Sequence, residues 1–190
     1  MRILSSISVV IFVFFASNAI AAPQIYALDA NRSDVVFTWR FGEEFINGRI
    51  PVDAANVVLD LDAINRSDVR VALDARAAQA GFLFATQALR GPHVFDAESF
   101  PQITFQSENF RFDGNAVEVD GAVTIRGVTR PMVMQATLYR QQGTEPSDRD
   151  HLAIQLVGAV NRHDFGASGF ANQVGPEVEF RILAYIDRVP

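Results

Sequence analysis

Apolar and polar residues alternate along most of the chain, and this pattern is the main guide to its fold. In DVVFTWRF, which begins at Asp34, every odd position from Val35 to Phe41 is apolar. The same period recurs in DVRVALDA from Asp68, NAVEVDGAVTIRG from Asn115 and EVEFRILAYID from Glu177. Weaker versions run through residues 56–62, 101–112, 130–141 and 151–161. Strands with one buried and one wet face have this period, so the sequence predicts about eight of them or more.

Turn-forming residues separate the strands, and one segment breaks the alternation. Gly and Pro occur in the short connections at 113–115, 126–128, 143–147 and 175–176. Strands joined in sequence by such turns favour an antiparallel barrel or sandwich. The stretch ARAAQAGFLFATQALR, from Ala75 to Arg90, instead predicts one inserted helix, weakened by Gly81. We expect residues 77–90 to cover one mouth of a barrel and to gate access to it.

The first 21 residues have the pattern of a secretory signal peptide. A basic residue, Arg2, precedes an apolar run at 7–16, and Ala19-Ile20-Ala21 offers small residues around a cleavage site. A membrane anchor is disfavoured because the apolar run is too short to span about 30 Å of hydrocarbon. The remaining residues, 22–190, are predicted to form a single domain.

The composition indicates in which compartment the protein works and which class of partner it does not bind. The chain has no cysteine, which fits a bacterial periplasmic protein whose core is large enough to stand without disulfides. Its net charge is −6, and its 16 basic residues are all arginines spread along the chain. A nucleic-acid partner is therefore not expected, because such proteins concentrate basic residues on one surface.

The candidate chemistry is sparse. The three histidines, His93, His151 and His163, match no metal-ligand spacing, so no metal and no cofactor are expected. His163 and Asp164 lie in the run NRHDFG and leave a hydrolase open as a minor alternative. Neighbouring residues of a strand point to opposite faces, so hydrogen bonding at a strand end is the simpler interpretation. No catalytic residue is assigned.

The aromatic content raises a different question. Phenylalanine accounts for 16 residues, against one tryptophan and three tyrosines. Its ring has no polar end, so it suits contact with hydrocarbon, whether that belongs to the protein or to a ligand. Small residues on inward strand positions would leave a cavity, whereas phenylalanine with alanine also describes a packed core. The residues alone leave both interpretations open.

Three stretches, in order, give a resemblance to a known family. They are HVFDAESFPQITFQS from His93, VDGAVTIRGVTRPMVMQATL from Val119 and NRHDFG from Asn161. With them, the chain resembles the YceI-like family of bacterial periplasmic proteins. The resemblance implies a lipocalin-like antiparallel β-barrel whose interior binds a polyisoprenoid or a related long-chain lipid, of quinone or prenyl type. It also implies no catalytic activity. Transient contact with a membrane is compatible with it, as is a dimer, and the oligomeric state is left open.

The predicted ligand-binding residues are apolar. Strand parity places nine of them on the wall of the cavity: Phe37, Trp39, Phe105, Val123, Ile125, Met132, Met134, Leu156 and Phe180. The resemblance adds Phe95 and Phe100 near the cavity. The chain departs from the family at residues 77–89, where a polar run is replaced by AAQAGFLFATQAL. This change favours a ligand with a neutral head, such as a quinone, over a pyrophosphate.

A small outer-membrane β-barrel is the main alternative, since it too combines a signal peptide with alternating strands. Such barrels carry girdles of aromatic residues at both interfaces, and tryptophan and tyrosine are scarce here. The sequence therefore favours a protein free in the periplasm.

Overall fold

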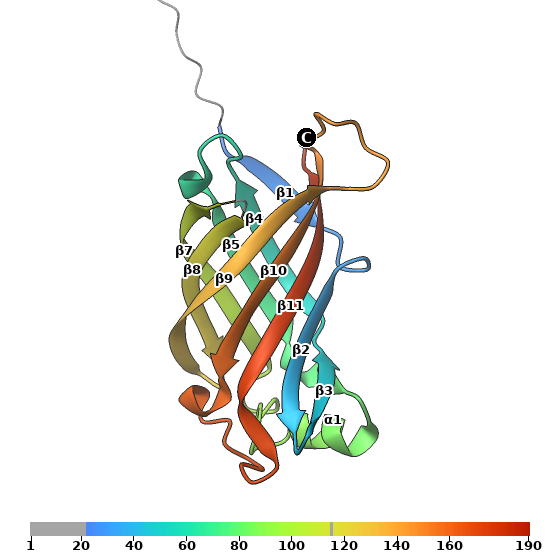
Figure 1. The fold of residues 1–190 in the computed structure, drawn as a ribbon, viewed down its shortest axis with the longest axis vertical. Coiled ribbons are helices and arrows are strands. Elements are labelled where there is room, and N and C mark those ends of the chain that lie inside the picture. The colour runs from blue at the N-terminus through green and yellow to red at the C-terminus, as the bar shows by residue number, and fades with distance from the viewer. Residues whose placement is uncertain (1–21, 115) are drawn as a thin grey trace, which may run out of the picture.

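The computed structural model describes residues 22–114 and 116–190, so the predicted signal peptide, residues 1–21, lies outside the described residues. Strands dominate, as predicted (Figure 1). They are β1 (Gln24–Leu28), β2 (Asp34–Phe41), β3 (Glu44–Arg49), β4 (Val52–Leu59), β5 (Asp68–Asp74), β6 (Gln79–Ala80), β7 (Gln102–Asp113), β8 (Ala116–Ile125), β9 (Val128–Arg140), β10 (His151–Asn161) and β11 (Val174–Arg188). The helical elements are α1 (Leu83–Arg90) and three 3-10 turns, η1 (Ile64–Arg66), η2 (Ala75–Ala77) and η3 (Arg162–Phe165).

The strands close into an antiparallel barrel, which confirms the predicted fold class. Neighbours follow the order β1-β4-β5-β7-β8-β9-β10-β11, and β11 pairs again with β1 to complete a closed circuit of eight strands. Every pairing is antiparallel, for example Phe105 opposite Val123 and Gly158 opposite Phe180. Closure leaves the sheet without exposed edges along the circuit, which protects it from edge-to-edge association.

Three further strands extend the sheet at one end of the barrel. β2 pairs with the part of β11 that β1 leaves free, β3 pairs with β2, and β6 pairs with β3. In this way β1 and β2 share one edge of β11, with β1 towards the chain termini and β2 towards α1 (Figure 1). We call the end that carries α1 the lower end, as Figure 1 shows it, and the opposite one the upper end.

The inserted helix is shorter than the sequence predicted. It begins at Leu83, whereas the prediction placed a helix from Ala75 or Ala77 onwards. Residues 75–77 form η2, and Gln79 and Ala80 continue as β6, because their backbone pairs with Arg49 and Gly48 of β3. Ladder pairing therefore outweighs the helical propensity of this alanine-rich run. In the described residues, no helix is long and apolar enough to cross a membrane.

A bulge in β7 changes which residues face inward. The register with β8 shifts between Ser107 and Asn109. Ser107 is buried, as is Phe110 three positions later, whereas strict alternation would turn Phe110 outward. The extra residue lets β7 present both Phe105 and Phe110 to the interior.

A buried carboxylate organises the loop after β4 at the upper end. The Asp60 side chain is 2% exposed and accepts hydrogen bonds from the backbone N–H groups of Asp62 and Ala63. It also forms an ion pair with Arg66. Burial alone would raise the pKa of Asp60, but these N–H groups and Arg66 outweigh it and hold the pKa below its ordinary value. The loop therefore folds over the upper end around a charged carboxylate.

Candidate functional site: the barrel interior

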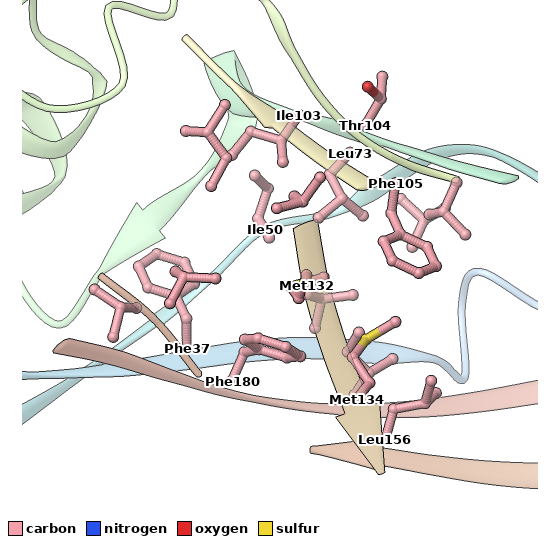
Figure 2. A pocket seen from close by; sticks show the side chains of 18 of the residues that line it. Phe37, Ile50, Leu73, Ile103, Thr104, Phe105, Met132, Met134, Leu156 and Phe180 are labelled. Carbon is pink, nitrogen blue, oxygen red and sulfur yellow. The ribbon is translucent and has the colours of Figure 1, made fainter. Parts of the chain in front are cut away.

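The barrel encloses an apolar cavity of about 580 Å³. This volume lies within the range of small-molecule binding sites. Figure 2 shows side chains from facing walls pointing into it: Ile50, Leu73 and Ile103 from one side, and Phe180 and Leu156 from the other. Polar side chains are few among the lining residues, namely Ser33, Thr104, Arg162 and Gln173. Hydrocarbon is the chemistry that this surface matches best.

Ten of the eleven residues predicted to bind ligand lie on the cavity wall. They are Phe37, Trp39, Phe95, Phe105, Val123, Ile125, Met132, Met134, Leu156 and Phe180. Phe100 is the exception and corrects that expectation: it does not line the cavity, and its ring lies over Gly127, in the β8–β9 turn. A backbone hydrogen bond from the Phe100 N–H to the Asp96 carbonyl belongs to the turn that sets the ring there.

Glycines explain why so many phenylalanine rings leave the interior hollow. The ring of Phe180 lies over Gly158, and a Cβ added to this glycine would come 2.4 Å from the ring's Cζ. Phe37 lies in the same way over Gly48, with the corresponding distance 2.3 Å. Each of these rings occupies the space that a side chain on the neighbouring strand would need. The rings therefore lie along the wall instead of filling the centre.

Phe105 repeats this arrangement on the opposite wall. Its ring lies over Gly121 of β8, where an added Cβ would be 2.5 Å from the ring's Cζ. Nearer the lower end, Phe37 stacks on Trp39 with ring centroids 5.4 Å apart and contacts Phe95 at 6.0 Å. Trp39 is the only tryptophan of the chain, so its fluorescence reports on the cavity.

Among the described residues that line the cavity, Arg162 is the one with a charged side chain, and its guanidinium is hydrogen-bonded to the backbone. It is buried and donates hydrogen bonds to the carbonyls of Gly175, Gly169 and Val174, each at 2.8 Å, and to that of Ala167. Burial lowers the pKa of the guanidinium below its ordinary value. In the described residues no carboxylate pairs with it. Arg162 thus fastens the loop between η3 and β11.

The cavity opens at the lower end. Four phenylalanines there are exposed and also line the cavity, namely Phe41 of β2, Phe82 and Phe84 beside and in α1, and Phe170 of the η3–β11 loop. At the upper end, the exposed lining residue is Leu138. The lower end therefore has the larger share of accessible apolar wall, and we call it the mouth.

Neither the hydrolase nor a metal site gains support from the geometry. His163 and Asp164 are exposed in η3, and neither lines the cavity. The backbone N–H of His163 donates to the Asn161 side chain, which is the strand-end bonding that the sequence suggested. Within residues 22–114 and 116–190, no cluster of three or more His, Asp or Glu side chains could hold a metal ion.

The outer face of the barrel is charged where the inner face is apolar. In β8, Glu118 and Asp120 point outward between the lining residues and pair with Arg111 of β7. On β11, Arg181 alternates in the same way with Phe180 and Ile182. Outer-membrane barrels have an apolar belt outside and a polar interior, so this distribution is the reverse of theirs.

Comparison with known proteins decides the family. The model of the YceI-like domain matches residues 26–185, nearly the whole described chain. The chain belongs to the YceI-like family. Protein YceI of Salmonella arizonae is 24% identical over 147 residues, which are 77% of this chain and 73% of the relative. The resemblance seen in the sequence is thereby confirmed.

Solved structures similar to this YceI-like chain support the fold. BcnA of Burkholderia cenocepacia has a TM-score of 0.75 at 19% identity, covering 84% of this chain and 99% of BcnA. A polyisoprenoid-binding domain from Saccharophagus degradans has a TM-score of 0.65 at 12% identity, covering 87% of this chain and 99% of that domain. At these identities the likeness concerns the fold, which is the barrel described above.

Sequence reasoning missed several wall residues of this YceI-like barrel. Many share a parity with residues it did choose, as Val35 does with Phe37, and Ile103 with Phe105. Their alternation was a sufficient signal. Phe165, in η3, and Phe170, in the η3–β11 loop, carry no such signal, because the period of a strand does not extend into turns and loops. Arg162 lay in a motif that the sequence singled out, but its burial depends on carbonyls of residues 167–175.

Proposed function

We propose that the protein is a periplasmic carrier that holds a polyisoprenoid, or a related long-chain lipid, inside the barrel. The observation that carries the proposal is the apolar cavity of about 580 Å³ that opens at the mouth. Membership of the YceI-like family supports it, and so does the structural similarity to a domain described as polyisoprenoid-binding. The predicted signal peptide and the absence of cysteine support the periplasm.

Burial of the tail supplies the binding energy in this proposal. Removing ~500 Å² of apolar tail surface from water at ~25 cal/mol per Å² contributes about 12 kcal/mol before costs. Ordering a flexible tail and immobilising the ligand subtract several kcal/mol, which leaves room for micromolar to nanomolar affinity. No charged anchor is required for binding of this strength.

The head of the ligand would lie at the mouth. Arg162, the charged lining residue, already donates to four carbonyls, and Arg90 donates its Nε–H to the Ala78 carbonyl at 2.6 Å. The segment 77–89 contributes no charged side chain. An uncharged head, as in a quinone or a prenyl alcohol, fits this mouth better than a pyrophosphate.

Native mass spectrometry of the protein isolated from its own periplasm tests the proposal most directly. A noncovalent complex whose extra mass equals that of an isoprenoid lipid is expected. Fractionation by osmotic shock in the same experiment should release the protein with the soluble periplasmic fraction. Protein that carries no lipid and also fails to bind added isoprenoids would contradict the carrier function.

Replacement of Phe105 by alanine should weaken binding of a fluorescent isoprenoid about tenfold or more. The ring is a large apolar contact on the wall, and its loss is worth roughly 1–3 kcal/mol of binding free energy. Raising the salt concentration should change the affinity of the wild type several-fold at most, because no ion pair anchors the tail. Titrations of both proteins at low and high salt measure the two effects. A steep salt dependence would indicate an anionic head and contradict the assignment of a neutral one.

Bound lipid should slow amide hydrogen exchange in α1. The helix lines the cavity through Ala85, Ala88 and Leu89. Phe84, in its first turn, lines the cavity too and is also exposed to solvent. A ligand in the mouth adds contacts to this segment, and short exposed helices open locally with low free energies. Exchange in β10, which pairs with β11 along its whole length and with β9 from Leu152 to Val157, serves as the internal control. Equal exchange of α1 with and without lipid would argue against a gating role.

A further inference from the structure

Exposed phenylalanines gather around the mouth. Among the described residues six phenylalanines are exposed, and five of them lie at the lower end, the exception being Phe112. In and beside α1 three consecutive side chains face solvent: Phe82 is 51% exposed, Leu83 68% and Phe84 75%. We define the apolar rim as Phe41, Phe45, Phe82, Leu83, Phe84 and Phe170. Single exposed apolar residues are ordinary, but a cluster of this size marks a contact surface.

The rim segments meet in space although they come from distant parts of the chain. The N–H of Gly42, next to Phe41, donates to the Gln173 carbonyl at 2.8 Å. The backbone of Ala80, two residues before Phe82, pairs with Gly48 of β3. Figure 1 shows the β2–β3 tip, α1 and the η3–β11 loop together at the lower end. The exposed apolar side chains therefore belong to segments that lie together at the end of the barrel where the cavity opens.

The rim also lacks charge where it protrudes most. From Ala77 to Leu89 the chain has no Asp, Glu, Lys, Arg or His, although charged residues make up 20% of the whole. A segment that contacts only water usually carries charged side chains, as the outer faces of the strands do. Uncharged, aromatic and exposed side chains instead match an environment that is apolar but external to the protein.

We propose that the apolar rim inserts into the surface of a lipid bilayer, with the mouth of the cavity facing the membrane. Four rim residues, Phe41, Phe82, Phe84 and Phe170, also line the cavity, so the apolar wall continues without a break onto the inserted surface. A hydrocarbon tail could then pass between bilayer and barrel without crossing water. Membrane docking goes beyond the carrier function and can hold or fail independently of it.

A bilayer fits the rim better than a second copy of the chain. Protruding side chains need a partner that adapts to them, and the headgroup and acyl boundary of a membrane does so. A second copy would present the same protruding ring and would have to offer a matching hollow. Glu43 and Glu44 lie in the turn between the rim residues Phe41 and Phe45, and in a symmetric contact they would repel the same two residues of the second copy.

The same two carboxylates set the expected lipid preference. Glu43 and Glu44 are exposed at the tip of the β2–β3 hairpin, beside the inserted side chains. The protein as a whole is acidic, with a net charge of −6. Anionic lipids would repel these charges, so apolar insertion should favour a zwitterionic surface over an anionic one.

Vesicle flotation tests the proposal with wild type, the double variant F82S/F84S and the control F112S. Phe112 is 72% exposed, a fraction similar to the 75% of Phe84, but it lies in β7 at the upper end. Wild type and F112S should float with phosphatidylcholine vesicles, and F82S/F84S should need at least about tenfold more lipid for equal recovery, since two inserted rings are lost. Vesicles that also contain phosphatidylglycerol should bind wild type no better.

Several results would overturn the proposal. Wild type that fails to float, or F112S that loses binding as much as F82S/F84S, removes the rim as a membrane surface. Dimerisation of wild type in sedimentation experiments, abolished by F82S/F84S, with no flotation, would assign the rim to a second copy. The variant G158V, designed to obstruct the cavity, should still float, so membrane docking and lipid carriage are measured separately.

Discussion

Replacing Gly158 by valine is expected to weaken isoprenoid binding about tenfold or more while leaving the barrel folded. An added Cβ would lie 2.4 Å from the Cζ of Phe180, and the two other nearest atoms also belong to that ring. The ring therefore moves, and the cavity is the free space beside it. The loss of stability should stay near 1 kcal/mol, because the ring has room and valine favours a strand. Titration with a fluorescent isoprenoid and thermal unfolding measure the two effects.

A second substitution shows whether the ring is the cause. In the double variant G158V/F180A the displaced ring is absent, so binding should recover part of the loss. G81A is a glycine control, since an added Cβ would meet only the Ile46 Cγ2 at an ordinary 3.7 Å and should leave affinity unchanged. If G158V binds as wild type does, the cavity is not the ligand site. Gly48 and Gly121 are less useful, because a Cβ there also meets backbone oxygens.

The second large effect is expected at Arg162. Alanine at this position leaves the buried carbonyl of Ala167 and the partly buried carbonyls of Gly169, Val174 and Gly175 without this donor. Unsatisfied buried acceptors cost roughly 1–3 kcal/mol each, and partial access to water moderates the sum. We expect R162A to lower the free energy of unfolding by on the order of 3–5 kcal/mol. Denaturant unfolding of R162A and wild type measures the difference.

Another arginine at the lower end provides the comparison. Arg130 of β9 is exposed, and its Nη1 contacts only the adjacent Thr129 carbonyl at 3.3 Å. R130A should change the free energy of unfolding by less than about 0.5 kcal/mol. Equal effects of R162A and R130A would mean that the guanidinium does not hold the η3–β11 loop.

Much of this fold follows from a period of two. In β2, the odd residues Val35, Phe37, Trp39 and Phe41 all line the cavity, as their alternation predicts. The pattern fails where the backbone departs from regular pleating. Phe110 lies inside only because the bulge at Ser107 shifts β7 by one residue. A sequence pattern does not show a bulge before the partner strand is known.

The boundaries of the inserted helix and the position of Phe100 were set by contacts distant in sequence. Gln79 and Ala80 form a strand because their backbone pairs with that of β3. The ring of Phe100 lies outside the cavity because Gly127, at φ +71°, has no side chain and the ring packs over it. That the barrel is hollow also depends on pairs such as Phe180 with Gly158, which are 22 positions apart and meet only in the assembled sheet.

The interrupted pairing near the mouth affects which ligands the barrel can hold. Among the described residues β6 pairs with β3 and not with β7, so at the lower end no backbone ladder joins these two strands. Between these strands the chain forms α1 and residues 91–101, whose side chains Leu89, Phe95 and Ala97 pack in the core. The circumference of the lower half is thus limited by side-chain packing, whereas the upper half keeps continuous hydrogen bonding around its whole circumference. A wide tail is therefore accommodated more easily near the mouth than in the upper half, so we expect the upper half to set the greatest girth of tail that the barrel accepts.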